Sequence, residues 1–86
     1  MINYKYPAVF YYDKPSKTYC AAIDDLAIYM VGDTVEDAHL SASEVLLSYI
    51  KTSLKYGFDI PDATSFDELT KKHPNELVML VECNIK

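Results

Sequence analysis

The strongest constraint on this sequence is one long helix, predicted over Val35–Tyr56, a segment that contains neither Gly nor Pro. Asp33 and Thr34 before it both favour helix caps, and each has an acidic residue three positions later. The Asp33 register, with Glu36, fits the usual capping box better, but both registers remain open. Gly57 supplies the left-handed terminus. At 1.5 Å per residue such a helix is about 30 Å long and spans a small sheet.

Four segments rich in β-branched and aromatic residues are predicted strands: residues 4–12, 18–23, 27–31 and 77–85. The first two form a hairpin around a turn at 13–17. Pro7 cannot donate a ladder hydrogen bond, so we expect it at a strand start or where one side is unpaired.

A short helix capped by Ser65, at 66–71, precedes the last strand. The run 77–81 is apolar without alternation, which indicates burial of both faces and an inner or covered position. The predicted order is β-β-β-α-(short α)-β. It fits one α+β domain over 1–86, with four strands and the long helix on one face.

The long helix carries two apolar surfaces. Its main face should pack on the sheet. Leu40, Leu47 and Leu54 recur every seven residues and form a separate edge. Two covers are possible for this edge: Phe66 and Leu69 of the short helix, which we favour, or a partner helix. The main face comprises Val35, Ala38, Ala42, Val45, Leu46, Tyr49, Ile50 and Ser53.

The second sheet face has no predicted cover and would expose many of the eight tyrosines. Such an apolar patch on a small domain usually marks an interface, so we expect self-association, a partner, or both. No run has the length of a membrane span, and the N-terminus lacks a secretory signal. Cys20 and Cys83 lie in apolar runs, which favours reduced thiols and a cytoplasmic protein.

The net charge of −5 and the absence of a basic cluster argue against nucleic-acid binding by this chain. An acidic surface suits a basic partner, although it also simply keeps a protein soluble.

Signals for catalysis are weak. Asp24-Asp25 could bind a metal, but adjacent strand residues point to opposite faces, so a turn is the better interpretation. Neither His39 nor His73 is placed beside a nucleophile, and no metal or phosphate motif is present. We therefore expect no catalytic, metal or cofactor site and no small-molecule substrate.

Three motifs in order resemble the N-terminal domain of HicB-type antitoxins. They are YPAVF at 6–10, GDTVEDA at 32–38 and Ile60-Pro61 after the helix. The resemblance implies a partial RNase H-like fold with a mixed sheet, in which the last strand runs parallel beside the first. It also implies a non-catalytic protein that binds a small basic HicA-type toxin, an mRNA interferase, and that forms dimers or larger oligomers.

The family usually continues into a DNA-binding domain, and none follows Lys86, so autorepression is not expected of this chain. An alternative function is a stand-alone homo-oligomeric module of the same fold without a toxin. Residues at strand ends or on the uncovered face are the expected partner contacts: Tyr11, Tyr12, Asp24, Asp25 and Tyr29.

Overall fold

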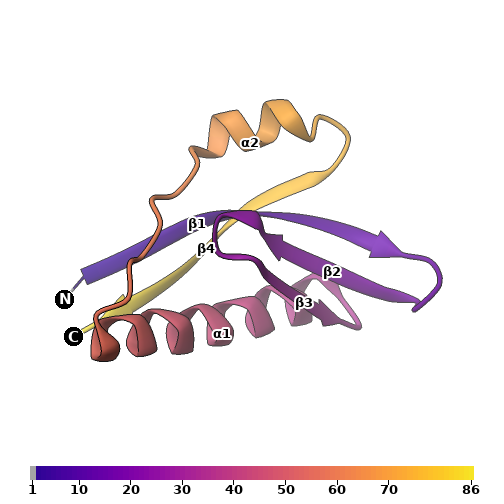
Figure 1. Cartoon of the computed structure of the whole chain (residues 1–86). Helices are drawn as coiled ribbons and strands as arrows, with labels where there is room; N and C mark the ends of the chain where they lie inside the picture. Colours follow the sequence, from indigo (N-terminus) through magenta and orange to yellow (C-terminus); the bar gives the residue numbers. More distant parts are fainter. Residues whose placement is uncertain (1) are drawn as a thin grey trace.

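The structure, a computed structural model, describes residues 2–86 and places two helices on opposite faces of one sheet (Figure 1). The strand order is β3-β2-β1-β4, and α1 contacts β2, β3 and β4 whereas α2 contacts β1 and β4. The α+β class and element order are therefore confirmed. The elements are β1 (Ile2–Asp13), β2 (Thr18–Ile23), the 3-10 turn η1 (Asp24–Leu26), β3 (Ile28–Gly32), α1 (Val35–Tyr56), α2 (Phe66–Lys72) and β4 (Leu77–Ile85).

The main core lies between α1 and the sheet. Ala38, Ala42, Leu46 and Ile50 of α1 are fully buried, at four-residue spacing along one stripe. They pack with inward residues of the strands, including Tyr6, Ile23 and Val81. Each buried Leu or Ile contributes about 1.5–3 kcal/mol relative to exposure. The main helix face is thus confirmed.

The two termini of α1 explain its length. The Thr34 hydroxyl accepts a hydrogen bond from the Asp37 backbone N–H at 3.0 Å, so Thr34 is the cap and the Asp33 register is wrong. Gly57 ends the helix with φ 69°, as predicted. Ala27 also has a positive φ, 53°, at the end of η1. This left-handed residue delays the third strand to Ile28, one residue later than predicted.

Pro7 lies inside β1, where its missing N–H costs nothing. It stands opposite Leu80 of β4, and β1 pairs with β2 only from Val9 onward. In an antiparallel pair, alternate residues turn their N–H and C=O away from the partner strand. Pro7 therefore faces the side that β2, which ends at Ile23, does not reach. The expectation of an unpaired side is confirmed.

The pairing of β4 corrects the expected mixed sheet. Leu77 lies opposite Phe10 and Ile85 opposite Ile2, so β4 runs antiparallel to β1 and all strands are antiparallel. The parallel strand was an implication of the family resemblance, and it is wrong for this chain. Instead, the loop 57–65 and α2 carry the chain back along the other sheet face before β4 begins (Figure 1). The return strand therefore starts at the opposite end of β1.

The strand β4 is an edge strand, not an inner one. Its two faces contact α1 and α2, which is why its sequence lacks alternation. The cover is incomplete, since Leu77 and Leu80 are 47% and 44% exposed.

The favoured cover for the leucine edge is wrong. Leu69 of α2 packs with Val9 and Val78 on the sheet face opposite α1, and Phe66 is largely exposed. The crossover loop (residues 57–65) delivers α2 to that face, where Leu69 finds apolar partners. On α1, Leu40 and Leu54 remain exposed.

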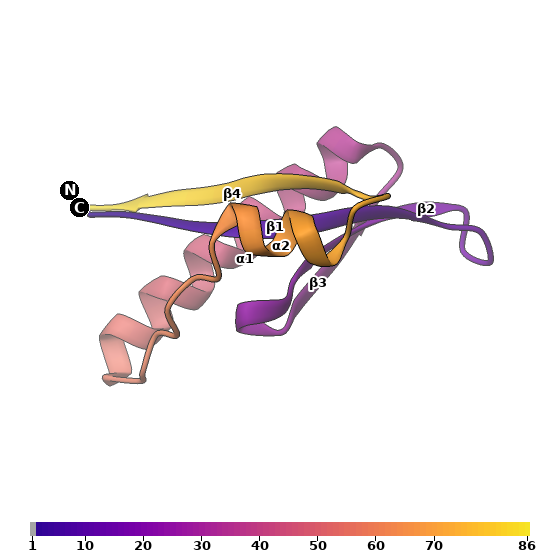
Figure 2. The same cartoon turned by 90° about the horizontal axis from the view of Figure 1, so that it is seen from above.

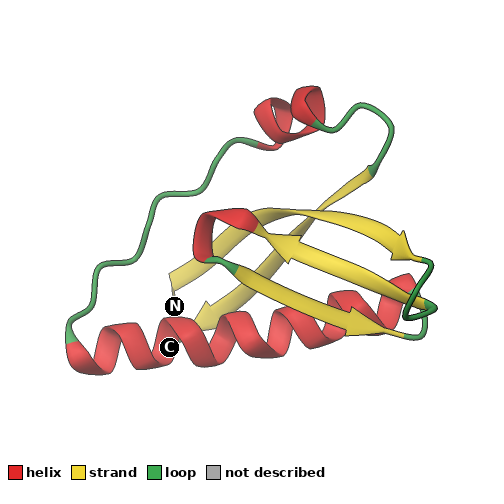
Figure 3. Cartoon of the chain, turned by 45° about the vertical axis from the view of Figure 1, so that its right-hand side comes forward, coloured by secondary structure: helices red, strands yellow, loops and turns green. Residues whose placement is uncertain are grey.

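The crossover loop is held at two points as it passes around the sheet (Figure 3). The Tyr6 hydroxyl donates to the Pro61 carbonyl at 2.6 Å. The Asp25 carboxylate accepts two hydrogen bonds from Thr64, at 2.8 Å from its N–H and 2.7 Å from its hydroxyl. These bonds fix the path that places α2.

We predict that Gly32→Ala destabilises the fold more than Gly57→Ala. A Cβ at Gly32 would lie 2.8 Å from the Asp37 carbonyl carbon, with the Ala38 nitrogen closer still. The backbone would have to shift, at a cost of about 1–3 kcal/mol or more. A Cβ at Gly57 would contact no neighbouring atom, but a side chain at this positive φ strains the backbone by about 1 kcal/mol. Urea denaturation measures both, and equal losses would contradict the close approach at Gly32.

We predict that Asp25→Ala lowers the free energy of unfolding by about 1–3 kcal/mol, because two hydrogen bonds to Thr64 are lost. The same measurement on Asp24→Ala provides the control. Asp24 is exposed, and the change there should stay within about 0.5 kcal/mol. Faster amide exchange at Thr64 should accompany the first variant alone. A similar response from both would show that the Asp25 contact does not hold the loop.

Candidate partner-binding surface

The sheet face opposite α1 is the far face, and strand register decides which side chains it carries. Tyr11 stands opposite Cys20, and Cys20 opposite Val31, in one row across β1, β2 and β3. The next row joins Val9 to Ala22 and Ala22 to Tyr29. Side chains of directly opposed residues share one face. These two rows therefore lie on the face that Leu69 contacts at Val9.

The helix α2 covers only half of the far face. It contacts β1 and β4, and Figure 2 shows it lying over β1. Val9 and Val78 are buried beneath it, but Tyr29 is 63%, Val31 56% and Tyr11 41% exposed. Cys20, between them in the row, is half-buried. We name this open surface the aromatic patch: Tyr11, Cys20, Tyr29 and Val31.

Acidic groups border the aromatic patch. Desolvation raises the pKa of Tyr11, with further contributions from the Cys20 side chain and the charges of Asp13 and Glu76. The Tyr11 hydroxyl is therefore a neutral hydrogen-bonding group at physiological pH. A tyrosine in this state offers an apolar ring and a polar tip, the combination common in protein interfaces. The acidic border favours a partner with positive charge.

The structure brings together two of the five expected contacts, Tyr11 and Tyr29. Tyr12 lies on the α1 side of the sheet, where its ring meets Tyr19 edge-on at 5.1 Å between centroids. Asp24 is exposed at the start of η1. Asp25 is engaged with Thr64 and so serves the crossover loop.

Cys20 and Val31 were missed as surface residues. Alternation along each predicted strand was available as a signal, because residues two apart share a face. What the sequence did not provide was the register that places Val31 beside Cys20 and Tyr11. The position of α2, which leaves this half of the face open, was also not predictable from local pattern.

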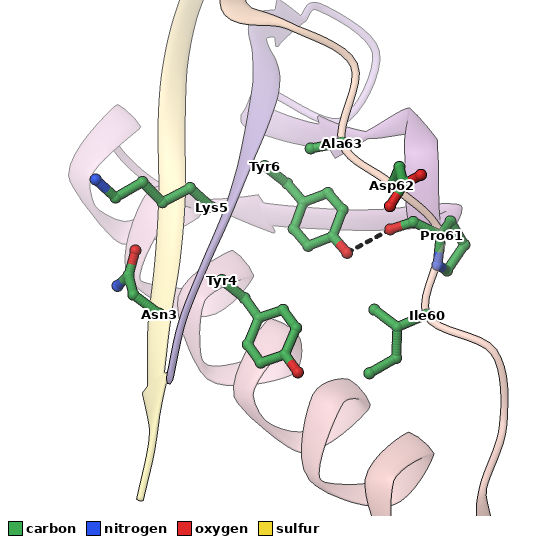
Figure 4. Close-up of a pocket in the computed structure, with 8 residues that line it drawn as sticks. All are labelled: Asn3, Tyr4, Lys5, Tyr6, Ile60, Pro61, Asp62 and Ala63. Carbon is green, nitrogen blue, oxygen red and sulfur yellow. Dashed lines mark hydrogen bonds between the residues drawn. The ribbon is translucent and has the colours of Figure 1, made fainter. Parts of the chain in front are cut away.

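A hollow of about 420 Å³ lies between β1 and the crossover loop (Figure 4). Tyr4 and Tyr6 point into it from the strand, facing Ile60 and Pro61. Burial raises the pKa of Tyr6, which keeps its hydroxyl protonated as the donor to Pro61. The hollow thus lies where the crossover loop passes β1, and the hydrogen bond from Tyr6 to Pro61 holds the loop there.

Residues 2–86 contain no group of three or more His, Cys, Asp or Glu side chains arranged to hold a metal ion. Both histidines make structural contacts. The His39 Nε2–H donates to the Leu80 carbonyl at 2.9 Å and its ring stacks on Phe10. His73 donates to Glu76 at 2.8 Å. Neither described helix is apolar over a length sufficient to cross a membrane.

Two solved structures share this fold. The N-terminal domain of the Burkholderia pseudomallei antitoxin HicB has a TM-score of 0.81 and 20% identity, over 95% of this chain and 100% of that one. The B. pseudomallei antitoxin HicB has a TM-score of 0.80 and 19% identity, over 95% of this chain. The alignment covers 64% of that antitoxin's length. At these identities the likeness shows the fold alone.

No curated protein matches the chain in sequence. A family model does. The model of the HicB-like antitoxin of bacterial toxin–antitoxin systems matches residues 5–80, which include all three motifs that carried the resemblance. The chain belongs to this HicB-like antitoxin family.

Proposed function

We propose that residues 1–86 act as one HicB-like antitoxin domain, a non-catalytic cytoplasmic protein that binds and neutralises a small basic toxin of HicA type. The observation that supports this most is the aromatic patch, an open apolar surface with an acidic border in a chain of an antitoxin family. No cofactor or small molecule has a part in this function, and the chain itself does not contact nucleic acid.

Charge and aromatic surface together provide a mechanism of neutralisation. A toxin that cleaves mRNA must bind phosphates with Lys and Arg side chains. An acidic protein with net charge −5 attracts that same surface and speeds association. Tyr11 and Tyr29 then bury their rings against it, as interface anchors do. The antitoxin would thus compete directly with RNA for the toxin.

The contact residues in this proposal are centred on the aromatic patch. Tyr11 and Tyr29 are the anchors, Val31 and Cys20 fill the surface between them, and Asp24 adds charge nearby. Tyr12 and Asp25 have other surroundings: Tyr12 lies on the opposite sheet face, and Asp25 already binds Thr64.

A second candidate function is the stand-alone homo-oligomeric module without a toxin. The exposed leucines of α1 favour self-association in either case. The two functions differ in their partner. A small basic protein encoded beside this chain that binds it and is toxic when expressed alone supports the antitoxin. Absence of both properties supports the stand-alone module.

We predict that Tyr29→Ala weakens binding to that neighbouring toxin by about tenfold or more, the effect of losing an interface anchor. Tyr56→Ala is the matched control, because Tyr56 is 62% and Tyr29 63% exposed. Tyr56 ends α1, away from the far face. Isothermal titration at two salt concentrations also tests the charge contribution, since affinity should fall as salt rises. Equal affinities for the two variants would show that the toxin binds a surface other than the aromatic patch.

A further inference from the structure

The short helix α2 has a single buried side chain to hold it on the sheet. It lies on the sheet face opposite α1 (Figure 1). Leu69 packs there with Val9 and Val78, in a cluster separate from the main core. Every other residue of Phe66–Lys72 is exposed. Because a helix this short has little stability in water by itself, its place on the sheet depends mainly on Leu69.

The segment 65–76, which contains α2, makes its hydrogen bonds within itself. The Leu69 N–H donates to the Ser65 carbonyl and the His73 N–H to the Leu69 carbonyl, at 3.1 and 3.0 Å. The His73 ring donates to Glu76 in the turn that follows. Within residues 2–86, none of the hydrogen bonds of this segment reaches a strand or α1. Lifting it from the sheet would therefore separate one apolar cluster and break no bond to the rest of the chain.

Both ends of this segment are fixed independently of α2. On one side, Thr64 is bound twice to Asp25. On the other side, Leu77 pairs with Phe10 where β4 begins. These fixed points act as hinges, so that the segment can leave and regain the sheet as a unit. Segments with few buried apolar contacts open locally far more often than the whole domain unfolds.

The surface beneath α2 continues the aromatic patch. One row of opposed residues crosses all four strands: Val78, Val9, Ala22 and Tyr29. Tyr29 at one end is open, whereas Val9 and Val78 at the other end are 3% and 8% exposed beneath Leu69. Removal of α2 would therefore extend the open apolar surface from β3 to β4.

We infer that residues 65–76 form a hinged cover, and that the partner of the aromatic patch binds the chain with this cover open. Val9 and Val78 then join Tyr11 and Tyr29 in the contact surface. The partner is the neighbouring basic toxin, an identity that rests on the proposed function, whereas the opening is a property of this chain alone.

The size of a stable protein interface favours the open form as the one that binds. Such an interface takes about 800 Å² and about 20–30 residues from each partner. The aromatic patch consists of four side chains, all of them partly buried. The row beneath α2 is the adjoining apolar surface. In the free chain, the closed cover keeps the two valines from water and limits the exposed apolar area, which otherwise promotes aggregation.

Hydrogen exchange of the free chain tests the cover directly. A segment that opens in about 0.1–10% of molecules gives amide protection factors of about 10–1000. The Leu69 and His73 amides should share one such value, because α2 is too short to stay helical once it leaves the sheet. The amide of Ile50, in the core of α1, should be protected at least about tenfold more. Protection of Leu69 and His73 equal to that of Ile50 would overturn the inference.

Leu69→Ala should tighten toxin binding by about tenfold, because the variant no longer has to open a closed cover before it binds. The matched control is Phe66→Ala on the same helix, where the side chain is already 42% exposed and no change is expected. Isothermal titration gives both affinities, and circular dichroism shows that each variant is folded. A purely structural role of Leu69 predicts weaker or unchanged binding, and either result would contradict the hinged cover.

Exchange in the complex distinguishes the hinged cover from the proposed function. With the toxin bound, the Leu69 and His73 amides should lose their remaining protection, whereas the Ile50 amide should keep its own. Increased protection of Leu69 and His73 would show that α2 stays on the sheet, which overturns the inference. A neighbouring protein that does not bind at all would instead contradict the proposed function, and exchange of the free chain would still show whether the cover opens.

Discussion

The structure depends on how closely α1 approaches the sheet. Ala38 and Ala42 bring the helix backbone down to the strands, and Gly32 has no room for even one more carbon. Protein interiors are packed too tightly for such contacts to move without cost. Because the helix is fixed there, its main stripe becomes core, and Leu40 and Leu54 of its leucine edge are left exposed. The exposure of these leucines is thus a consequence of the tight contact.

The crossover loop has a different consequence, on the other side of the sheet. It carries α2 to the far face, where the helix covers Val9 and Val78 and leaves the aromatic patch open. The two exposed surfaces therefore lie on different parts of the molecule and differ in charge. One is the leucine edge of α1, and the other has Asp13 and Glu76 near Tyr11.

Local pattern predicted most of the elements and little of their arrangement. The bounds of α1, its Gly57 terminus and the strand at 18–23 are as expected, because caps and periodicity are properties of neighbouring residues. The direction of β4 and the site of α2 depend on the path of the crossover loop, which is set by long-range bonds from Asp25 and Tyr6. Nothing near Asp25 in sequence indicates Thr64 as its partner. The same limit applies to the surface: Tyr11 and Tyr29 were selected by residue type, but only the register joins them through Cys20 and Val31.

Pro7 also limits which strands can pair with β1. A strand that paired with β1 on the β2 side beyond Val9 would direct a carbonyl at a ring nitrogen that carries no hydrogen. If β2 slid by two residues, which would keep each side chain on its own face, it would meet this defect. The proline therefore disfavours a two-residue slide of β2 toward the N-terminal end of β1. It also prevents a foreign strand from forming a continuous ladder along the open part of β1.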